Sequence, residues 1–213
     1  MSSKHKVWIF LSKSLRIGSG VVVLPFHNPV RVAEEFALLD IISDGRLDFG
    51  IGRGYQPAEF KGYGIPFEES KGRFDESLEI IRQAWTHGEV DYKGKHYQFE
   101  NLSVRPRPVQ RPVPPFFGAS FNADTIKFQA EKKMNLLFSS LSAQGYHIDE
   151  YWSTLEKMGE NPNDYRMGVL VFVYLDEDRE KAYRDFEKPC MWYFRTFLKM
   201  IPSKEYPTDE GFY

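Results

Sequence analysis

The chain alternates between short apolar runs and longer segments in which apolar residues recur every three or four positions. The apolar runs predict five β-strands, and the amphipathic segments between them predict helices. The expected strands are residues 16–24, 47–52, 115–119, 135–139 and 167–175. The expected helices are residues 29–42, 72–87, 122–131, 146–158 and 178–200. Because the runs are continuously apolar, they suit a parallel sheet that is covered on both faces.

The first strand–helix–strand unit has the clearest boundary signals. Asn28 is a capping residue placed directly before Pro29, which is favoured at the first helical position. Gly45 lies just past the end of the helix, where glycine is the preferred terminator. The unit is complete within about forty residues, which predicts parallel pairing of its two strands.

Three other segments depart from simple alternation. Residues 90–103 alternate around Lys93-Gly94 and predict a hairpin insertion. Residues 53–69 are expected to form a long loop, and the proline-rich residues 105–115 an extended connector. Pro189 is expected to kink or interrupt the last helix. The pattern defines an α/β fold, but five strands leave both a (β/α)8 barrel and a doubly wound open sheet possible.

Composition narrows the class of protein. A single domain over residues 1–213 is long enough to bury a substantial core, and the net charge of -2 gives no general attraction for nucleic acid. Cys190 is the single cysteine, which excludes an internal disulfide and a cysteine-based metal cluster. The apolar run 7–11 is too short for a signal peptide or a membrane span, so the expected location is the cytoplasm. No metal-ligand spacing, nucleophilic-serine motif or nucleotide-binding glycine loop is found.

The strand at 47–52 runs directly into the sequence Gly52-Arg53-Gly54. A guanidinium between glycines can bind phosphate oxygens while bare backbone approaches the ligand. The alternative is a structural salt bridge from Arg53 to Asp48 or Glu59, and the spacing favours neither.

A second group of candidates lies between the strand at 115–119 and its helix. Ser120 and Thr125 supply hydroxyl groups near a helix N-terminus, which is a ready seat for phosphate, whereas Asn122 is a cap that needs no ligand. His27 and Asn28 sit where the first strand passes to its helix, and both are interpreted first as turn or cap residues.

Three stretches together resemble the bacterial luciferase-like flavin monooxygenase family. The first is RIGSGVVVLPFHNPVRVAEEFALLDIISDGRLDFGIGRGY, residues 16–55. The second joins Phe74-Asp75-Glu76 and Trp85 to Tyr92-Lys93-Gly94 and to PVQRP at 108–112. The third is Phe117-Gly118-Ala119-Ser120. Together they cover most of residues 16–140.

The resemblance implies a (β/α)8 TIM-barrel type of fold that is incomplete here, with strands three to seven present. Residues 1–15 would be a divergent remnant of the preceding helix and residues 201–213 an irregular tail. Flavin mononucleotide (FMN) would bind at the carboxyl ends of the strands. A non-proline cis peptide is implied at Gly20-Val21, beneath the flavin ring. The implied cofactor-binding residues are Gly20, Val21, Gly52, Arg53, Gly54, Tyr55, Glu59, Ala119, Ser120 and Thr125.

The family's activity is oxidation of a small organic substrate by dioxygen, using reduced FMN that a separate flavin reductase supplies. A sister branch uses a deazaflavin for hydride transfer, and the residues do not choose between them. A second hypothesis is a non-catalytic partial barrel that self-associates through its unpaired strand edges, as a homo-oligomer. In a barrel, the loops at 25–28, 53–69, 119–122 and 139–145 should gather on one face.

Overall fold

A computed structural model describes residues 12–120, 123–139 and 145–200. The expectations for residues 1–11, the cap at Asn122, the loop segment 140–144 and the tail 201–213 lie outside these ranges. The chain forms two compact units, which are described in turn. The first comprises residues up to Gly54 together with Ile65–Leu170, and the second comprises Tyr55–Gly64 and the residues from Val171 onward.

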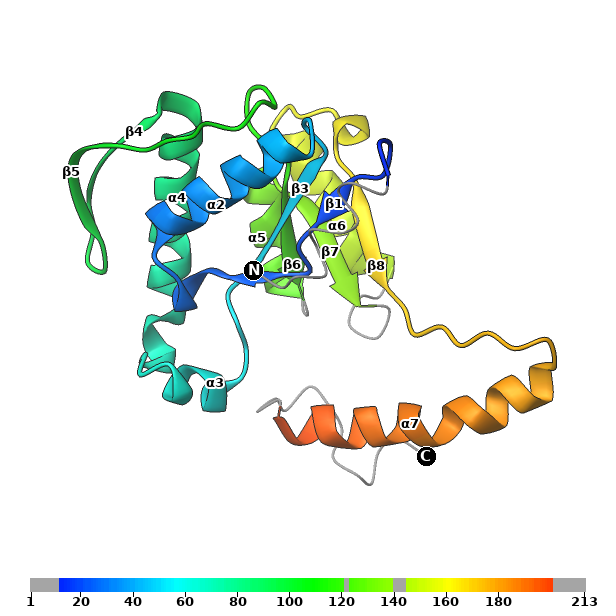
Figure 1. The fold of residues 1–213 in the computed structure, drawn as a ribbon. Helices are drawn as coiled ribbons and strands as arrows, with labels where there is room; N and C mark the ends of the chain where they lie inside the picture. The colour runs from blue at the N-terminus through cyan, green and yellow to red at the C-terminus, as the bar shows by residue number, and fades with distance from the viewer. Residues whose placement is uncertain (1–11, 121–122, 140–144, 201–213) are drawn as a thin grey trace. The chain divides into compact units, whose positions relative to one another are not determined.

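The first unit is built on a six-stranded parallel sheet (Figure 1). Its order is β1, β3, β6, β7, β8, with β2 also paired to β3. The strands are β1 (Ile17–Gly18), β2 (Val22–Val23), β3 (Leu47–Gly52), β6 (Phe116–Ser120), β7 (Asn135–Ser139) and β8 (Met167–Leu170). Every neighbouring pair is parallel, which confirms the α/β class predicted from the alternation of strands and helices.

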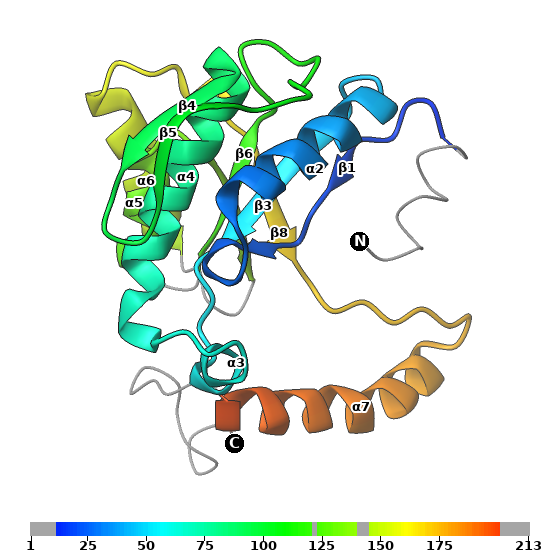
Figure 2. The ribbon, with the colours of Figure 1, turned by 60° about the vertical axis from the view of Figure 1, so that its left-hand side comes forward.

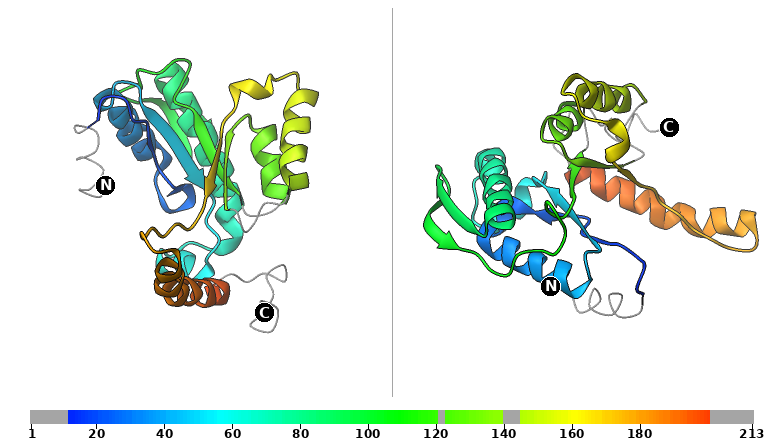
Figure 3. Two further views of the ribbon diagram at one scale, coloured as in Figure 1. Left: turned by 90° about the vertical axis from the view of Figure 1, so that its right-hand side faces the viewer. Right: turned by 90° about the horizontal axis from the view of Figure 1, so that it is seen from above.

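Helices connect these strands as crossovers. Helix α2 (Pro29–Ile42) and helix α4 (Ser70–His87) pack against each other beside β3, as Figure 2 shows. Helix α5 (Ala123–Glu131) and helix α6 (Gly145–Lys157) lie side by side next to β7 and β8 (Figure 3). Short 3-10 turns are η1 (Leu24–Phe26), η2 (Phe67–Glu69) and η3 (Pro162–Asp164). The sheet is curled, as in part of a TIM barrel.

Phe49 of β3 lies at the centre of the larger hydrophobic cluster, where the strand packs against helices α2 and α4. Its ring centroid lies 4.6 Å from that of Phe36, 5.0 Å from that of Trp85 and 5.5 Å from that of Phe116. The indole Nε1 of Trp85 donates to the carbonyl of Ala33 at 2.9 Å, which joins α4 to α2. A smaller cluster under α5 and α6 contains Ile126, Ala130, Leu136, Phe138, Tyr151 and Leu155.

The start of α2 confirms the capping prediction. The side chain of Asn28 accepts hydrogen bonds from the backbone N–H groups of Val30, at 3.0 Å, and Arg31, at 3.3 Å. Pro29 occupies the first turn, where its missing N–H costs nothing because that group has no partner within the helix. Asn28 is therefore a structural cap in this fold.

The single strand predicted for residues 16–24 is wrong in its continuity. Gly18 pairs with Asp48 and Val22 with Ile51, so four steps along the first strand match three along β3. The extra residue breaks the ladder as a bulge does. Ser19 bridges the gap, because its hydroxyl donates to the carbonyl of Gly50 at 2.8 Å and accepts from the N–H of Gly50 at 3.0 Å.

The strand predicted for residues 167–175 is too long and is misplaced in the sheet. It ends at Leu170 because its neighbour β7 ends at Ser139, the last pair in the register. Among the described strands β8 pairs only with β7, so it lies at an edge, and Leu170 is 61% exposed. The continuously apolar run of residues 167–175 predicts instead a strand that is covered on both faces.

The second unit holds helix α3 (Pro57–Gly62) and helix α7 (Arg179–Met200). The presence of α3 corrects the prediction that residues 53–69 form one long loop. Helix α7 runs through Pro189 without interruption, which corrects the expected break. Aromatic contacts hold it on both sides of the proline: Phe172 lies against Tyr193 and Phe194, and Tyr174 stacks on Phe186.

The predicted hairpin insertion is present as β4 (Glu89–Lys93) and β5 (Gln98–Ser103), an antiparallel pair outside the main sheet. Its tip is held by the carboxylate of Glu76 on α4, which accepts from the backbone N–H groups of Lys95, His96 and Tyr97. Within the described part of the chain, no helix combines the length and apolarity needed to cross a membrane.

Candidate functional site

The carboxyl ends of four strands meet at one edge of the sheet. Val23 of β2 pairs with Gly52 of β3, and Ser120 at the end of β6 pairs with Phe138 of β7. The loops that follow these strands therefore begin at the same edge, as predicted, although parts of two of them lie outside the described residues. Active sites of (β/α) barrels occupy this edge.

The two faces of β3 have different surroundings. Leu47, Phe49 and Ile51 are fully buried in the core beside the helices. The alternate residues lie on the opposite, inner face, and two of them are glycines. A Cβ on Gly50 would lie 1.8 Å from the carbonyl oxygen of Ser19, so only glycine fits there. The bulged segment of the neighbouring strand can therefore approach β3 closely.

Arg53 follows β3 directly and is exposed. Within the described ranges its guanidinium forms no hydrogen bond or ion pair. The alternative of a salt bridge from Arg53 to Asp48 is therefore wrong, because Asp48 pairs with Arg16 and Arg166 instead. Glu59 belongs to the second unit, so the alternative of a salt bridge to Glu59 stays a prediction. The next residue, Gly54, has a φ of 82°, a left-handed conformation that favours glycine. Continuing the register of β3 and β6 by two residues aligns Arg53 with Ser120.

Ser120 is a buried polar residue, 2% exposed, at the carboxyl end of β6. Its hydroxyl has no hydrogen-bond partner among the described residues. Such orphaned groups are uncommon in native proteins, and an unbound ligand is one explanation. Thr125, one turn into α5, is half-buried and already has a partner within the protein.

Gln129 on α5 supports this strand end and was not found from the sequence. A Cβ on Gly118 would lie 1.9 Å from the Oε1 of Gln129, so the absence of a side chain at Gly118 leaves space for the Gln129 amide. Its Nε2 donates to the carbonyl of Ala119 at 3.3 Å. The Oε1 of Gln129 is a second buried polar atom without a partner in the described structure.

The remaining predicted residues divide between the two units. The Gly20-Val21 peptide bond is cis, the geometry that the family resemblance implies at this place. Gly20 is exposed, with no heavy atom within 4 Å of the position that a Cβ would take, and Val21 lies against Gly52. Tyr55 and Glu59 belong to the second unit, so the structure does not test their expected place beside a flavin.

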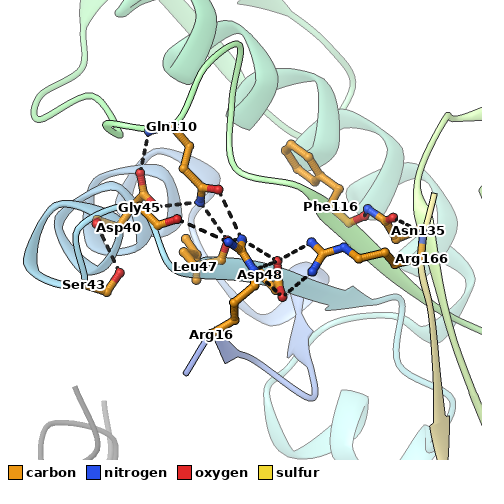
Figure 4. A network of polar contacts seen from close by, with 10 residues as sticks. All are labelled: Arg16, Asp40, Ser43, Gly45, Leu47, Asp48, Gln110, Phe116, Asn135 and Arg166. Atoms are coloured by element: carbon orange, nitrogen blue, oxygen red, sulfur yellow. Dashed lines mark hydrogen bonds and ion pairs between the residues drawn. The ribbon is translucent and has the colours of Figure 1, made fainter. Parts of the chain in front are cut away.

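The amino ends of the strands carry a network that no motif indicated (Figure 4). The carboxylate of Asp48, on the inner face of β3, is shared by two arginines. Arg16 approaches with its Nη2 at 2.7 Å from Oδ1 and its Nε at 3.0 Å from both oxygens. Arg166 approaches with its Nη2 at 2.6 Å from Oδ1 and its Nη1 at 3.2 Å from Oδ2. The hydrogen bond to Asp48 raises the pKa of Arg16 despite partial burial.

A second carboxylate anchors the proline-rich connector at the same edge. Buried Asp40 of α2 accepts from the backbone N–H groups of Val109 and Gln110 at 2.8 and 3.0 Å, and from the Gln110 Nε2 at 2.7 Å. Gln110 also accepts from Arg16 at 3.2 Å, so the two networks are joined. The connector is therefore held at a defined place before β6 begins.

The two edges thus differ in chemistry. In the network at the amino edge, the carboxylates of Asp48 and Asp40 are satisfied by arginines and backbone N–H groups, which suits a structural role. At the carboxyl edge an unpaired guanidinium and an orphaned hydroxyl occur together with close-packed glycines. This donor set fits an anionic group such as a phosphate, because the guanidinium and the hydroxyl can both donate to phosphate oxygens and neither has a partner among the described residues.

Fold and site together define an α/β protein of the TIM-barrel type, with a candidate anion-binding edge at the carboxyl ends of its strands. Residues 12–210 match the family of luciferase-like monooxygenases. The chain belongs to this family, whose members include flavin-dependent and F420-dependent enzymes.

Individual relatives agree with this assignment. The chain is 33% identical, over 80% of its length and 49% of the relative's, to the oxygenase component of a flavin-dependent trigonelline monooxygenase from Acinetobacter baylyi. It is 35% identical, over 80% of its length and 53% of the relative's, to an F420-dependent glucose-6-phosphate dehydrogenase from Amycolatopsis mediterranei. The crystal structure of monooxygenase RslO1 from Streptomyces bottropensis superposes with a TM-score of 0.82 at 26% identity, covering 91% of this chain and 60% of that one. The chain thus spans about half the length of these curated relatives.

Proposed function

We propose that this chain is a flavin-dependent monooxygenase that uses reduced FMN and dioxygen to oxidise a small organic substrate. The observation that carries the proposal is the carboxyl edge of the sheet, where the Arg53 guanidinium and the buried Ser120 hydroxyl have no partner among the residues that the structure describes. The flavin-dependent relative from Acinetobacter baylyi supports the choice of cofactor.

Each residue of this edge has a distinct proposed role. Arg53 and Ser120, with Thr125 at the start of α5, bind the FMN phosphate. Gly20, Val21 and Gly52 flank the ring, and Gly54 and Ala119 supply backbone without bulky side chains; Tyr55 and Glu59 complete the cofactor set. The flavin supplies the redox chemistry when it is bound, whereas the protein binds it, orients the substrate and excludes water.

Flavin titration tests this proposal. Wild-type protein should raise the fluorescence anisotropy of FMN, or quench its emission, in a saturable way by the high-micromolar range. Arg53→Ala should weaken FMN binding about tenfold or more, because hydrogen bonds to a charged group contribute about 1.5–3 kcal/mol each. Riboflavin, which lacks the phosphate, should bind wild type and the variant equally.

Arg111→Ala is the matched control. Arg111 is also exposed but bonds only to the carbonyls of Pro108 and Gln110, in the connector at the other edge of the sheet. This variant should bind FMN as wild type does. An absence of saturable binding in wild type, or equal FMN affinity in wild type and Arg53→Ala, contradicts the proposal.

The choice between FMN and a deazaflavin is a separate measurement. The F420-dependent relative motivates it, since that protein shares 35% of the aligned residues. We expect FMN to bind more tightly than F420 when both are titrated. The reverse order, together with hydride transfer to F420, would assign the chain to the deazaflavin-using branch.

The reaction partner and setting follow from the proposed chemistry. A separate flavin reductase would supply the reduced FMN in transient encounters in the cytoplasm, and the protein would act as a homo-oligomer. The trigonelline relative is itself named as an oxygenase component. Substrate turnover should then require both the reductase and dioxygen.

A non-catalytic partial barrel is the second candidate, and the sheet topology motivates it. Among the described strands, β1 and β2 at one side and β8 at the other each pair with one neighbour only. Open edges favour association with further strands. If the chain forms stable oligomers but neither binds flavin nor oxidises substrate with a reductase present, this second function is the correct one.

A further inference from the structure

A hollow of about 420 Å³ opens at the amino edge of the sheet, opposite the proposed flavin site. Phe116 and Asn135, which begin β6 and β7, form its floor. The connector residues 112–115 form an apolar wall, and α4 contributes Arg82 and Thr86. Its size falls in the range of about 300–1,000 Å³ that small-molecule sites occupy.

Arg82 is the unusual group in this hollow. It is half-buried, and its Cζ lies 5.2 Å from the ring centroid of Phe116. Its Nη2 donates to the carbonyl of Lys132 at 2.6 Å. Within the described residues it makes no other hydrogen bond and no ion pair. Burial lowers the pKa of Arg82, and the charge of Glu79, an exposed residue three positions earlier on α4, compensates only partly for the lost water.

The other charged groups of the hollow do not neutralise Arg82. Lys133 is paired with Oε1 of Glu160, and the hydroxyl of Tyr165 donates to Oε2 of the same carboxylate at 2.9 Å. Both oxygens of Glu160 are therefore engaged. Asp164 lines the hollow as well, but it is exposed, so solvent and salt screen its charge.

We propose that this hollow binds a small planar organic carboxylate, with its carboxylate on Arg82 and its apolar body against the proline wall. A guanidinium binds a carboxylate through two parallel hydrogen bonds, and in the described part of the chain Arg82 uses only Nη2 as a donor, to Lys132. The connector prolines and Val113 offer apolar surface that a fully hydrated inorganic anion would not use. The site is independent of the flavin, since it shares no residue with the carboxyl edge.

Benzoate and benzamide are a matched pair of probes, because they have nearly the same shape but only benzoate is charged. In the wild-type protein at low ionic strength, ¹⁵N-arginine NMR should show a saturable benzoate-dependent shift of the Arg82 Nε–H resonance. The dissociation constant should be in the millimolar range or tighter, and benzamide should bind at least fivefold more weakly. Salt at 0.5 M should weaken benzoate binding several-fold, because added salt screens the attraction between the two charges: the Debye length falls from about 10 Å at 0.1 M to about 3 Å at 1 M.

Variants locate the site. Arg82→Gln should abolish the preference for benzoate over benzamide, and Arg82→Lys should keep part of it. Arg53→Gln, at the carboxyl edge, and Arg111→Gln, in the connector, should leave benzoate binding unchanged. If Arg82→Gln does not fold, the wild-type resonance shift and the Arg82→Lys affinity still decide the question.

Three outcomes overturn the inference. They are equal binding of benzoate and benzamide by wild type, unchanged benzoate affinity in Arg82→Gln, and loss of benzoate binding in Arg53→Gln, which would place the ligand at the flavin edge. None of these depends on whether FMN binds, so this inference and the proposed function fail separately.

Discussion

Asp48 joins parts of the sheet that are far apart in the sequence. Arg16 directly precedes β1, and Arg166 directly precedes β8, three strands away from β3 in the sheet. Both guanidiniums reach the same carboxylate, and the Arg166 guanidinium also lies 4.9 Å from the ring centroid of Phe117. A flat sheet could not bring these strands together. The shared carboxylate therefore helps to hold the curl of the sheet.

We predict that Asp48→Asn lowers the free energy of unfolding by about 2 kcal/mol, within the range for hydrogen bonds to charged groups. The Asp48 side chain is 17% exposed, so its charge is shielded only partly from the two arginines. Losing that charge leaves two guanidiniums facing each other. Urea unfolding followed by circular dichroism measures the change.

Glu34→Gln is the control for Asp48→Asn. Glu34 pairs with Arg31 at 2.9 Å, but the arginine is 72% exposed, so this surface pair should contribute about 0.5 kcal/mol or less. Equal losses in the two variants would show that the shared carboxylate does not stabilise the curl.

Helix α2 shows how a local signal defines an element. Asn28 caps its first turn, and the helix ends with Ser43 as its C-cap. Gly45 follows with a φ of 72°, a left-handed conformation that favours glycine. Between these ends the buried face of the helix packs on β3 and α4. These signals lie within a few residues of the boundary, so neighbouring sequence suffices to predict it.

We predict that Asn28→Ala lowers the free energy of unfolding by about 1 kcal/mol, the usual cost of losing an N-cap. Asn28→Asp should retain most of the stability, because a carboxylate also accepts from the N–H groups of Val30 and Arg31. Chemical unfolding of the three proteins under the same conditions measures the difference. Equal stability of Asn28→Ala and wild type would mean that Pro29 and packing alone determine the helix start.

At the scale of the whole molecule, two tyrosines that are at least half-buried make the free energy of unfolding depend on alkaline pH. Burial, and then the hydrogen bond to Glu160, raise the pKa of Tyr165 to about 12. Burial also raises the pKa of Tyr151, whose hydroxyl donates to the carbonyl of Met134 at 2.7 Å. Between pH 10 and 12 the folded state keeps the Tyr165 proton that the unfolded state has lost. The stabilisation is therefore complete below about pH 10, the ordinary tyrosine pKa, and is lost as pH rises to about 12.

We predict that the stability of wild type falls more steeply than that of Tyr165→Phe between pH 10 and 12. Below pH 10 the two proteins should differ by a nearly constant amount, because neither state of wild type loses the proton there. Urea unfolding at pH 8, 10 and 11 measures the two profiles. Parallel profiles over this range would show that Tyr165 is not protected from ionisation in the folded state.

The amino-acid sequence by itself determined the elements whose signals are local. The bounds of β3 and β7, the cap at Asn28, the end of α4 at Gly88 and the β4–β5 hairpin agree with the predictions. So do the parallel α/β class and the family. These features depend on periodicity, capping and turn residues, which act over a few positions.

Only the tertiary structure decided features that depend on residues distant in the sequence. The break between β1 and β2 arises from one extra residue opposite β3, and β8 ends where β7 stops supplying partners. The sharing of Asp48 by Arg16 and Arg166 joins residues up to 118 positions apart. The same holds for the hollow beside Arg82, whose walls come from four separate segments. A one-dimensional pattern predicts which residues are apolar or charged, whereas the sheet register and curl decide which of them meet.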